Sequence, residues 1–327
     1  MPAVSAEEWL ERFLNVYWLR PETALIFSHD AMMYQKLREV ENNSMDIGCG
    51  DGITSFIFNG GIFSTKFDAY YSVNPDTSYV FEDKHPFLPG GVSDFYEGYD
   101  PGEFAALGNY VIQKPDMSYA YGTDWKQALV DKASYVGMYK KLVCHNSGKP
   151  LDFIKDESIN YIFSNTVFWV PNHEDLIKEM HRMLAKGGVF VGSFPNKNLY
   201  DETAIDRYRV KYGLSWIGQL DRGRGAHWQE MQKSGQYWRR LFKKAGFRTV
   251  AHEYYFPKQH FEFTEIGLRP LFPTLAKMRK MILNQDDFVE FKRYWIKNCL
   301  HFVAPFFTDK FFQKQVKVFQ MIRFEKK

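Results

Sequence analysis

The stretch that decides the fold is Ser44-Met45-Asp46-Ile47-Gly48-Cys49-Gly50-Asp51-Gly52. It has the form of a strand that opens into a glycine-rich nucleotide loop. Three glycines at alternate positions leave no Cβ between the backbone and a ligand, and each tolerates a positive φ in a sharp turn. We expect the loop to open a helix from about Thr54, whose free N–H groups and dipole favour a carboxylate or phosphate.

The spacing of the glycines separates two kinds of nucleotide loop. A dinucleotide fingerprint reads G-x-G-x-x-G, whereas this chain reads D-x-G-x-G-x-G. The latter pattern resembles motif I of the class I S-adenosylmethionine (SAM)-dependent methyltransferases. The resemblance implies that the loop cradles the methionine end of SAM and that an acid near its start, Asp46, holds the ammonium group. The implied cofactor-binding residues of the loop are Asp46, Gly48, Cys49, Gly50 and Gly52.

A second acid is needed at the end of the next strand, where it would pair with the ribose hydroxyls. About 20 residues beyond the loop the chain offers Asp68 and Asn74. Asp68 lies inside its apolar run rather than at the end, and the prolines that follow would break a crossover helix. The run 118–125 ends in Asp124 and precedes a helical pattern over 126–139 and a strand over 141–146.

This strand-acid-helix-strand unit resembles that of the same family and assigns the ribose contact to Asp124, with Trp125 beside it. A simple helix cap is the alternative role for Asp124. Asn146 and Ser147 follow the next strand, where the family often has the residue that meets adenine. The family residue is usually Asp, but an amide can still accept and donate hydrogen bonds.

The remaining strands follow in the order that the family has. Residues 156–171 resemble the fourth strand and a loop beside the cofactor, which places Ser164 and Asn165 at the site. Asn172 is expected to cap a helix that Gly187 ends, and 189–194 reads as the fifth strand. Ser234 caps a helix before the sixth strand, 247–256, and 316–324 would be an antiparallel seventh. We therefore predict a Rossmann-like, doubly wound α/β sheet of seven strands in the order 3-2-1-4-5-7-6.

Length and composition are consistent with one enzyme domain. The chain has 327 residues, of which 18% are aromatic, enough for a core and a substrate cavity. Its three cysteines show no C-x-x-C pairing, which argues against a zinc site or disulfide frame and suits a reducing cytosol. No signal peptide and no apolar run of about 18 residues is visible, so we expect a cytoplasmic protein without a bound metal.

We divide the chain into an N-terminal helical arm, 1–40, and a SAM-binding domain, 41–327, with three insertions. The arm begins with a capping-box pattern at Ser5, and either covers the SAM site or packs on the sheet. The first insertion, about 60–116, is expected to be a lid or substrate wall, with a structural subdomain or a subunit contact as the alternatives.

The second insertion, 197–233, is expected to form the acceptor loop, because ligand crevices of open α/β sheets lie at this edge. We interpret His227 as a candidate base and Asp221 as its orienting partner, and a basic loop tip is the plainer alternative.

The third insertion, 260–314, reads as a helical cap. A first amphipathic helix runs to Ile282, and a second is broken near Pro305. Residues 257–327 hold 14 Lys/Arg and 7 Asp/Glu, a charge of +7. Together with Phe306, Phe307, Phe311 and Phe312, this charge raises the hypothesis of peripheral contact with the inner face of a membrane.

The function that the resemblance implies is SAM-dependent transfer of a methyl group to a small-molecule acceptor, with sugar- or lipid-linked acceptors among the candidates, as in the methyltransferase type 11-like group. One alternative is a non-catalytic SAM-fold protein that acts through protein contacts. Another is an NAD-dependent oxidoreductase, which the glycine spacing disfavours. Nucleic acid is not expected as a partner, because the charge is modest and Ser164-Asn165-Thr166-Val167 replaces a base-flipping loop. The oligomeric state is left open.

Overall fold

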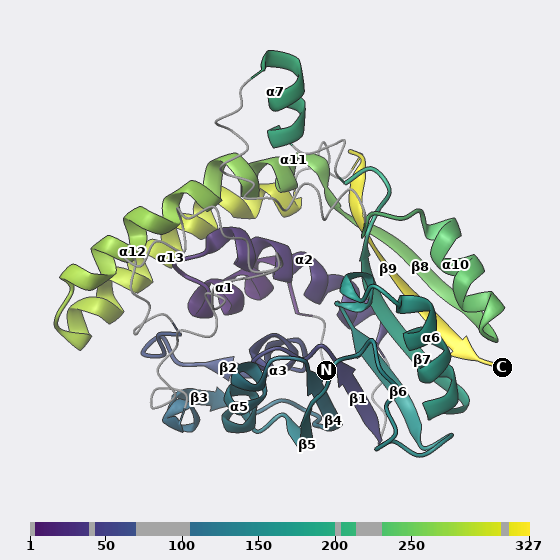
Figure 1. The fold of residues 1–327 in the computed structure, drawn as a ribbon. Coiled ribbons are helices and arrows are strands. Elements are labelled where there is room, and N and C mark those ends of the chain that lie inside the picture. Colours follow the sequence, from purple (N-terminus) through teal and green to yellow (C-terminus); the bar gives the residue numbers. More distant parts are fainter. Residues whose placement is uncertain (1–3, 39–42, 70–104, 200–203, 214–230, 309–313) are drawn as a thin grey trace.

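A seven-stranded sheet forms the centre of the computed structural model (Figure 1), which describes residues 4–38, 43–69, 105–199, 204–213, 231–308 and 314–327. Its strands are β1 Ser44–Ile47, β4 Tyr119–Asp124, β5 Tyr139–Cys144, β6 Ile159–Ser164, β7 Leu184–Pro195, β8 Phe247–Pro257 and β9 Lys317–Lys326. They lie in the order β5-β4-β1-β6-β7-β9-β8. Strand β9 pairs antiparallel to both of its neighbours, and the other neighbouring pairs are parallel. The predicted order 3-2-1-4-5-7-6 is confirmed.

Helices account for most of the remaining described chain. They are α1 Ala6–Val16, α2 Pro21–Leu37, α3 Ile53–Phe58, α5 Gln127–Val136, α6 His173–Met183, α7 Ala204–Tyr212, α10 Gly235–Lys244, α11 Lys258–Glu262, α12 Phe272–Met281 and α13 Gln285–Thr308. A π-helical segment, η5 Phe263–Leu268, follows α11, and a small hairpin pairs β2 Ile62–Phe63 with β3 Val111–Gln113.

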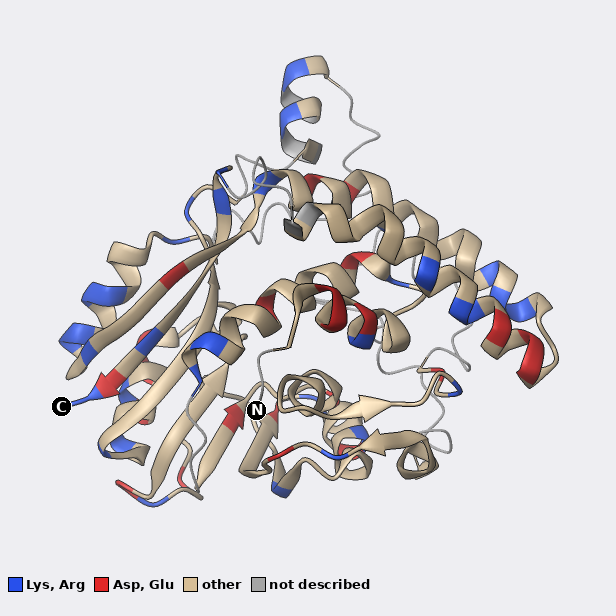
Figure 2. Cartoon of the chain, turned by 180° about the vertical axis from the view of Figure 1, so that it is seen from behind, with Lys and Arg blue, Asp and Glu red and all other residues tan. Residues whose placement is uncertain are grey.

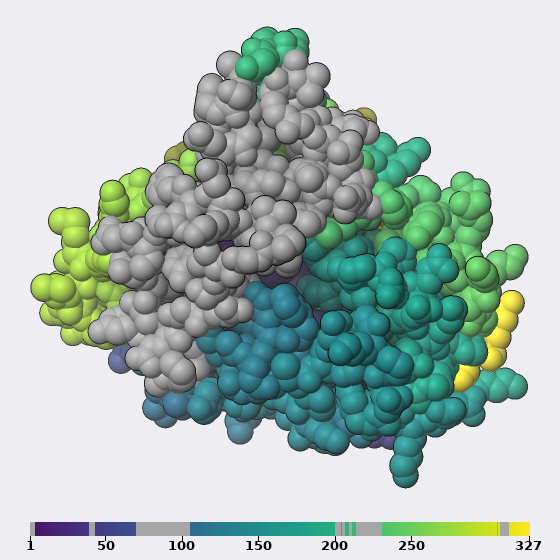
Figure 3. All heavy atoms as spheres, viewed as in Figure 1, coloured from purple at the N-terminus to yellow at the C-terminus, as the bar shows by residue number. Residues whose placement is uncertain are grey.

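The two faces of the sheet bury separate apolar clusters. Successive residues of a strand point to opposite faces, so Val189 and Val191 of β7 join one cluster with the N-terminal helices. Phe190 and Phe194 join the other, beneath α6 and α10. The ring of Phe190 stacks on Phe242 of α10 with centroids 5.2 Å apart. In the space-filling view, residues 105–199, blue to teal, form the lower surface of the molecule (Figure 3).

The N-terminal arm lies between the sheet and the α12–α13 pair (Figure 1). As the capping-box pattern predicts, Ser5 Oγ accepts the Glu8 N–H at 3.1 Å. Pro21 stands in the first turn of α2, where its fixed φ suits a helix start. At the junction of the two helices, the Tyr17 hydroxyl lies 3.4 Å from Thr54 Oγ1 in α3. The arm therefore both packs on the sheet and reaches the helix that follows the glycine loop.

A buried polar cluster fastens α12 and α13 to the residues after β2 and, through Asp68, to the arm. Arg279 of α12 and Asp68, just after β2, form an ion pair of 2.6 Å with side chains only 11% and 6% exposed. Asp68 also accepts the Trp18 indole N–H at 3.2 Å. The fully buried Lys292 of α13 donates to the carbonyls of Thr65 and Phe67. Asp68 is thus a structural residue of the cap.

Three expectations about the ends of α6 and α13 are wrong. Asn172 precedes α6 but forms no side-chain cap, because its φ and ψ of −98° and 48° are not the extended values of a capping residue. Helix α6 ends at Met183 rather than near Gly187, since Leu184 already pairs with Ile159 in the sheet. Helix α13 continues through Pro305 to Thr308. Its exposed position lets water satisfy the carbonyl that proline leaves unpaired.

Parts of the predicted insertions lie outside the described residues: 70–104 of the first, 200–203 and 214–230 of the second, and 309–313 of the third. Phe307 is described and buried, at 8% exposure, so it is not part of an exposed apolar face. The α12–α13 pair carries charges of both signs toward its free end (Figure 2). In the described chain, no helix has the length and apolarity that a membrane span requires.

We predict that Asp68→Ala lowers the free energy of unfolding by about 3–5 kcal/mol, because it leaves a buried guanidinium without its partner. SAM affinity should change little in the folded variant. Chemical denaturation and calorimetric titration measure the two quantities. The control, Asp152→Ala at an exposed position, should stay within about 0.5 kcal/mol of wild type. Equal stability of the two variants would show that the ion pair does not fasten the cap.

Candidate functional site

The glycine loop begins where β1 ends. The N–H groups of Gly48 and Cys49 both donate to the Thr123 carbonyl of β4, at 2.7 and 2.8 Å. Gly48, Gly50 and Gly52 have φ values of 76°, 57° and 78°, which glycine adopts without steric cost. A Cβ on Gly48 would lie 2.0 Å from Thr166 Oγ1, whereas a Cβ on Gly50 would meet nothing within 4 Å. Gly48 is therefore needed for packing, and Gly50 faces open space.

Asp46 places a carboxylate under the loop. Its side chain is buried, and its Oδ2 accepts hydrogen bonds from Ser55 Oγ at 2.6 Å and from the Tyr139 hydroxyl at 2.8 Å. Burial raises the pKa of Asp46 to about 6, against the lowering effect of these two hydrogen bonds. A positive charge near the loop would favour the ionised form.

Tyr139 reaches Asp46 because two glycines make room for its ring. A Cβ on Gly52 would lie 2.9 Å from the ring, and one on Gly122 would lie 2.6 Å from it. The ring thus lies against the backbone of both the loop and β4. Tyr139 is the first residue of β5, so the predicted helix over 126–139 ends earlier, where Gly137 takes a φ of 71°.

Asp124 lies beside the loop at the carboxyl end of the neighbouring strand. Its two oxygens accept the N–H groups of Gly50, at 3.1 Å, and Lys126, at 3.0 Å. Burial raises the pKa of Asp124, while these backbone hydrogen bonds lower it. Burial likewise raises the pKa of Asp51 to about 6. The next residue along the chain, Trp125, is 58% exposed, so a flat apolar ring stands beside the acid.

The loop after β6 supports the glycine loop from the other side. Ser164 Oγ and Thr166 Oγ1 both donate to the Ile47 carbonyl, at 2.7 and 3.1 Å. Ser164 is fully buried, so its hydroxyl holds the end of β1 beside the glycine loop. Asn165, between them, is half-buried.

The other predicted residues fall into two groups. Asn146 is exposed and Ser147 half-buried at the end of β5, and Asn146 Oδ1 accepts the Gly148 N–H at 2.9 Å. Cys49 is buried, and burial raises the pKa of its thiol well above the ordinary value. Cys49 therefore contributes its backbone, not a thiolate. Asp221 and His227 lie outside the described residues.

Four residues of the site were not predicted from the sequence: Ser55, Tyr139, Thr166 and Asp51. Asp51 stands inside the motif itself, so its carboxylate was visible. Ser55 lies in α3, nine residues after Asp46, and Tyr139 and Thr166 reach the loop from β5 and from the residues after β6.

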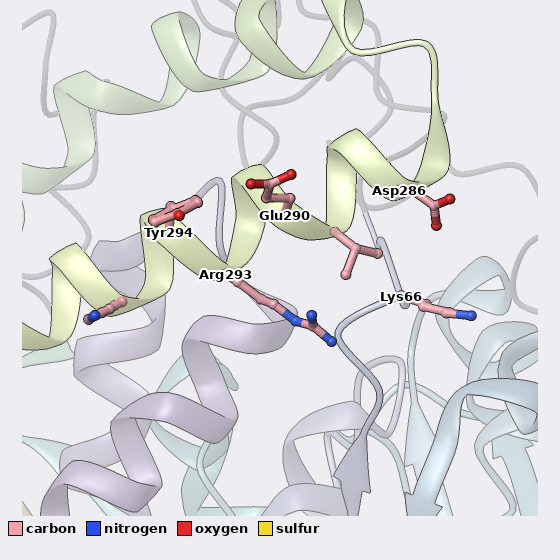
Figure 4. Close-up of a pocket in the computed structure, with 7 residues that line it drawn as sticks. Lys66, Asp286, Glu290, Arg293 and Tyr294 are labelled. Atoms are coloured by element: carbon pink, nitrogen blue, oxygen red, sulfur yellow. The ribbon is translucent and has the colours of Figure 1, made fainter.

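A separate pocket of about 590 Å³ lies between α13 and the residues after β2 (Figure 4). It is lined by Lys66, Asp286, Val289, Glu290, Arg293, Tyr294 and Lys297. None of the predicted site residues that the structure describes lines it. We place the candidate site at the glycine loop, because three carboxylates with raised pKa values surround that loop.

Solved structures that resemble this chain include methyltransferases of low sequence identity. A SAM-dependent methyltransferase from Thermotoga maritima, described as a possible histamine N-methyltransferase, is 14% identical with a TM-score of 0.44, covering 99% of this chain and 100% of that one. A phosphoethanolamine N-methyltransferase from Haemonchus contortus is 11% identical with a TM-score of 0.44, covering 99% and 60%. A SAM-dependent methyltransferase from Mesorhizobium loti is 13% identical with a TM-score of 0.42, covering 90% and 95%.

No curated protein sequence matches this chain significantly. A family model does: the model of the methyltransferase domain matches residues 28–252, more than half of the chain. The matched range includes β1, the glycine loop, Asp124 and the strands up to β7. The chain therefore belongs to the methyltransferase domain family.

Proposed function

We propose that the glycine loop binds SAM and that the chain transfers its methyl group to a small-molecule acceptor. Family membership implies SAM as the donor. The observation that carries the proposal is the buried carboxylate of Asp46 beneath a loop whose central glycine, Gly50, faces open space. SAM is a cation at both its ammonium and its sulfonium, so the ionised carboxylates of this loop attract it.

The chemistry of the residues at the loop fits the parts of SAM. Asp46 would stabilise the ammonium group through the poorly screened interior. Asp124 retains lone pairs for the ribose hydroxyls, because a carboxylate offers about four acceptor positions. Trp125, Asn146 and Ser147 would contact the adenine, and Asn165 would lie beside the methionine end. Gly48, Cys49, Gly52 and Ser164, which the sequence also assigns to the cofactor, shape the loop that would hold it.

SAM supplies an activated methyl group when bound, so the main task of the chain is to align the acceptor and exclude water. A base is needed only for an acceptor that carries a proton. His227 with Asp221 stays a prediction for that role. Acceptors of small size, including sugar- or lipid-linked ones, are part of the proposal.

Calorimetric titration with SAM, followed by incubation with methyl-labelled SAM and a small-molecule extract of cells, tests the proposal. We expect binding and a labelled low-molecular-weight product. Binding without any product would favour the alternative of a non-catalytic SAM-fold protein. Absence of SAM binding would contradict the cofactor assignment itself.

Gly50→Val should reduce SAM affinity at least tenfold, because its side chain enters the space that the ligand occupies. The matched control is Gly137→Val. Gly137 also has a positive φ, 71° against 57° for Gly50, and likewise has no atom within 4 Å of an added Cβ. Both variants should lose a similar free energy of unfolding, about 1–2 kcal/mol. If Gly137→Val weakens SAM binding as much as Gly50→Val does, the loop is not the ligand site.

SAM affinity should fall as the pH is lowered through about 6. The pKa values of Asp46 and Asp51 in the free protein are raised to about 6, so both are ionised above that pH and neutral below it. A cation binds the ionised form more tightly, hence affinity is present above pH 6 and is lost below it. Titrations between about pH 5 and 7 avoid the pH range in which the α-amino group of SAM itself titrates. Asp46→Asn should bind more weakly and with a shallower pH dependence; an unchanged slope would exclude Asp46 as the titrating group.

A further inference from the structure

A second buried polar network lies on the same face of the sheet as Asp46. Asp30 of α2, Tyr255 of β8 and Ser193 of β7 are 6%, 4% and 3% exposed. The Tyr255 hydroxyl donates to Asp30 Oδ1 at 2.5 Å and lies 2.7 Å from Ser193 Oγ. Three polar side chains from three elements thus form one chain of hydrogen bonds inside an otherwise apolar cluster.

The chain of hydrogen bonds has a direction. The single hydrogen of the Tyr255 hydroxyl goes to the Asp30 carboxylate, so the bond between Tyr255 and Ser193 takes its hydrogen from Ser193. The Ser193 oxygen keeps a lone pair with which it can accept another hydrogen. A proton that enters at Ser193 can therefore pass through Tyr255 to Asp30.

The network ends on β7, two strands from the glycine loop. Gly192 pairs with Ser164, and Ser164 Oγ bonds the Ile47 carbonyl at the start of the glycine loop. Ser193, one residue on, is therefore two strand spacings from β1, about 10 Å. It lies on the side of β1 away from Asp124, at the carboxyl edge where open α/β sheets bind ligands. Helix α2 connects the network with the helix that follows the glycine loop, because its Asp30 belongs to the network and its Tyr34 packs on Phe58 of α3.

Backbone strain occurs at the same place. Phe256, directly after Tyr255, is 1% exposed and has a φ of 60°, a conformation that costs a bulky residue free energy and is concentrated at functional sites. Its ring lies 4.7 Å from that of His29. His29 in turn bonds His260 through ring nitrogens 2.9 Å apart.

We propose that Asp30, Tyr255 and Ser193 form a proton relay for the acceptor, which is a small molecule methylated on a hydroxyl group. This inference rests on the proposed function. As the acceptor oxygen forms its bond to the methyl carbon and the carbon–sulfur bond breaks, the hydroxyl proton passes to Ser193. The Ser193 proton passes to Tyr255, and the Tyr255 proton to Asp30. Ser193 is the group that touches the acceptor, and the other two act through it.

The charges around Asp30 are consistent with this role. Burial raises the pKa of Asp30 to about 7, and Tyr255 lowers it by donating. Burial lowers the pKa of His29, and His260 and Lys317 lower it further, so His29 is neutral at pH 7. Another buried carboxylate, that of Glu265 on η5, accepts a different hydrogen bond, from the Ala204 N–H at 3.0 Å. Asp30 accepts a proton only when it is ionised. The rate of methyl transfer should therefore be high above about pH 7 and should be lost as the pH falls through about 7.

The test measures methyl transfer from labelled SAM to the extract, at about pH 6 to 9, in wild type, Asp30→Asn, Tyr255→Phe and Ser193→Ala. The amide introduced by Asp30→Asn can still accept the Tyr255 hydrogen bond, and Tyr255→Phe covers the case in which Asp30→Asn does not fold. The surface variant Asp175→Asn, with a side chain 66% exposed, is the matched carboxylate-to-amide control. His227→Gln tests the competing base.

We expect the wild-type rate of methyl transfer to rise with pH around a midpoint near 7. The three relay variants should lose this rate at least tenfold while their SAM affinity stays within twofold of wild type, and Asp30→Asn should show no rise with pH. The product should carry its methyl on oxygen. A second readout is the infrared band of a protonated carboxyl, which should titrate near pH 7 in wild type and vanish in Asp30→Asn.

An unchanged pH profile in Asp30→Asn, loss of the profile in His227→Gln alone, or methylation on nitrogen or carbon would overturn the relay while leaving the proposed function intact. SAM binding without any wild-type product would overturn both.

Discussion

The buried carboxylate of Asp46 is the constraint on which the site depends. Taking a carboxylate out of water disfavours its ionised form, and two hydrogen bonds from Ser55 and Tyr139 only partly offset this, since its pKa stays at about 6. Because the folded chain binds this proton more tightly than the unfolded chain does, the group costs stability as the pH rises through the window from its ordinary value to about 6. A cationic ligand removes that cost. Asp46 therefore makes the ligand-free loop less stable and the ligand-bound loop more stable.

The rest of the fold positions that charge. Glycines at 52 and 122 admit the Tyr139 ring, Gly48 admits Thr166, and the hydroxyls of Ser164 and Thr166 hold the last carbonyl of β1. Helix α2 covers the same face from Tyr34, which contacts Phe58, to Asp30, which accepts from Tyr255. The glycine loop and the proposed relay are therefore joined by one helix, and a change in the arm would affect both.

Much of this arrangement could be predicted from the sequence. Alternating strand and helix patterns indicate a parallel sheet, Ser5 and Ser234 cap helices as expected, and the glycine spacing indicates the methyltransferase loop. The order of elements decided the choice of Asp124 over Asp68, and the structure places Asp124 beside Gly50 and Asp68 beside Arg279. Local signals failed where tertiary pairing prevailed, as at Gly187, which lies within β7. Contacts such as those of Tyr139 and of Asp30 with Tyr255 have no local signature, since the partners are far apart in sequence.

The central claim, that buried carboxylates at the loop await a cationic methyl donor, is tested most directly by proton release. Calorimetric titration with SAM at about pH 6, in two buffers of different ionisation enthalpy, gives the number of protons exchanged on binding. The account predicts binding with release of on the order of one proton, because the cation lowers the raised pKa values of Asp46 and Asp51. Binding without proton release, or no binding at all, would contradict it.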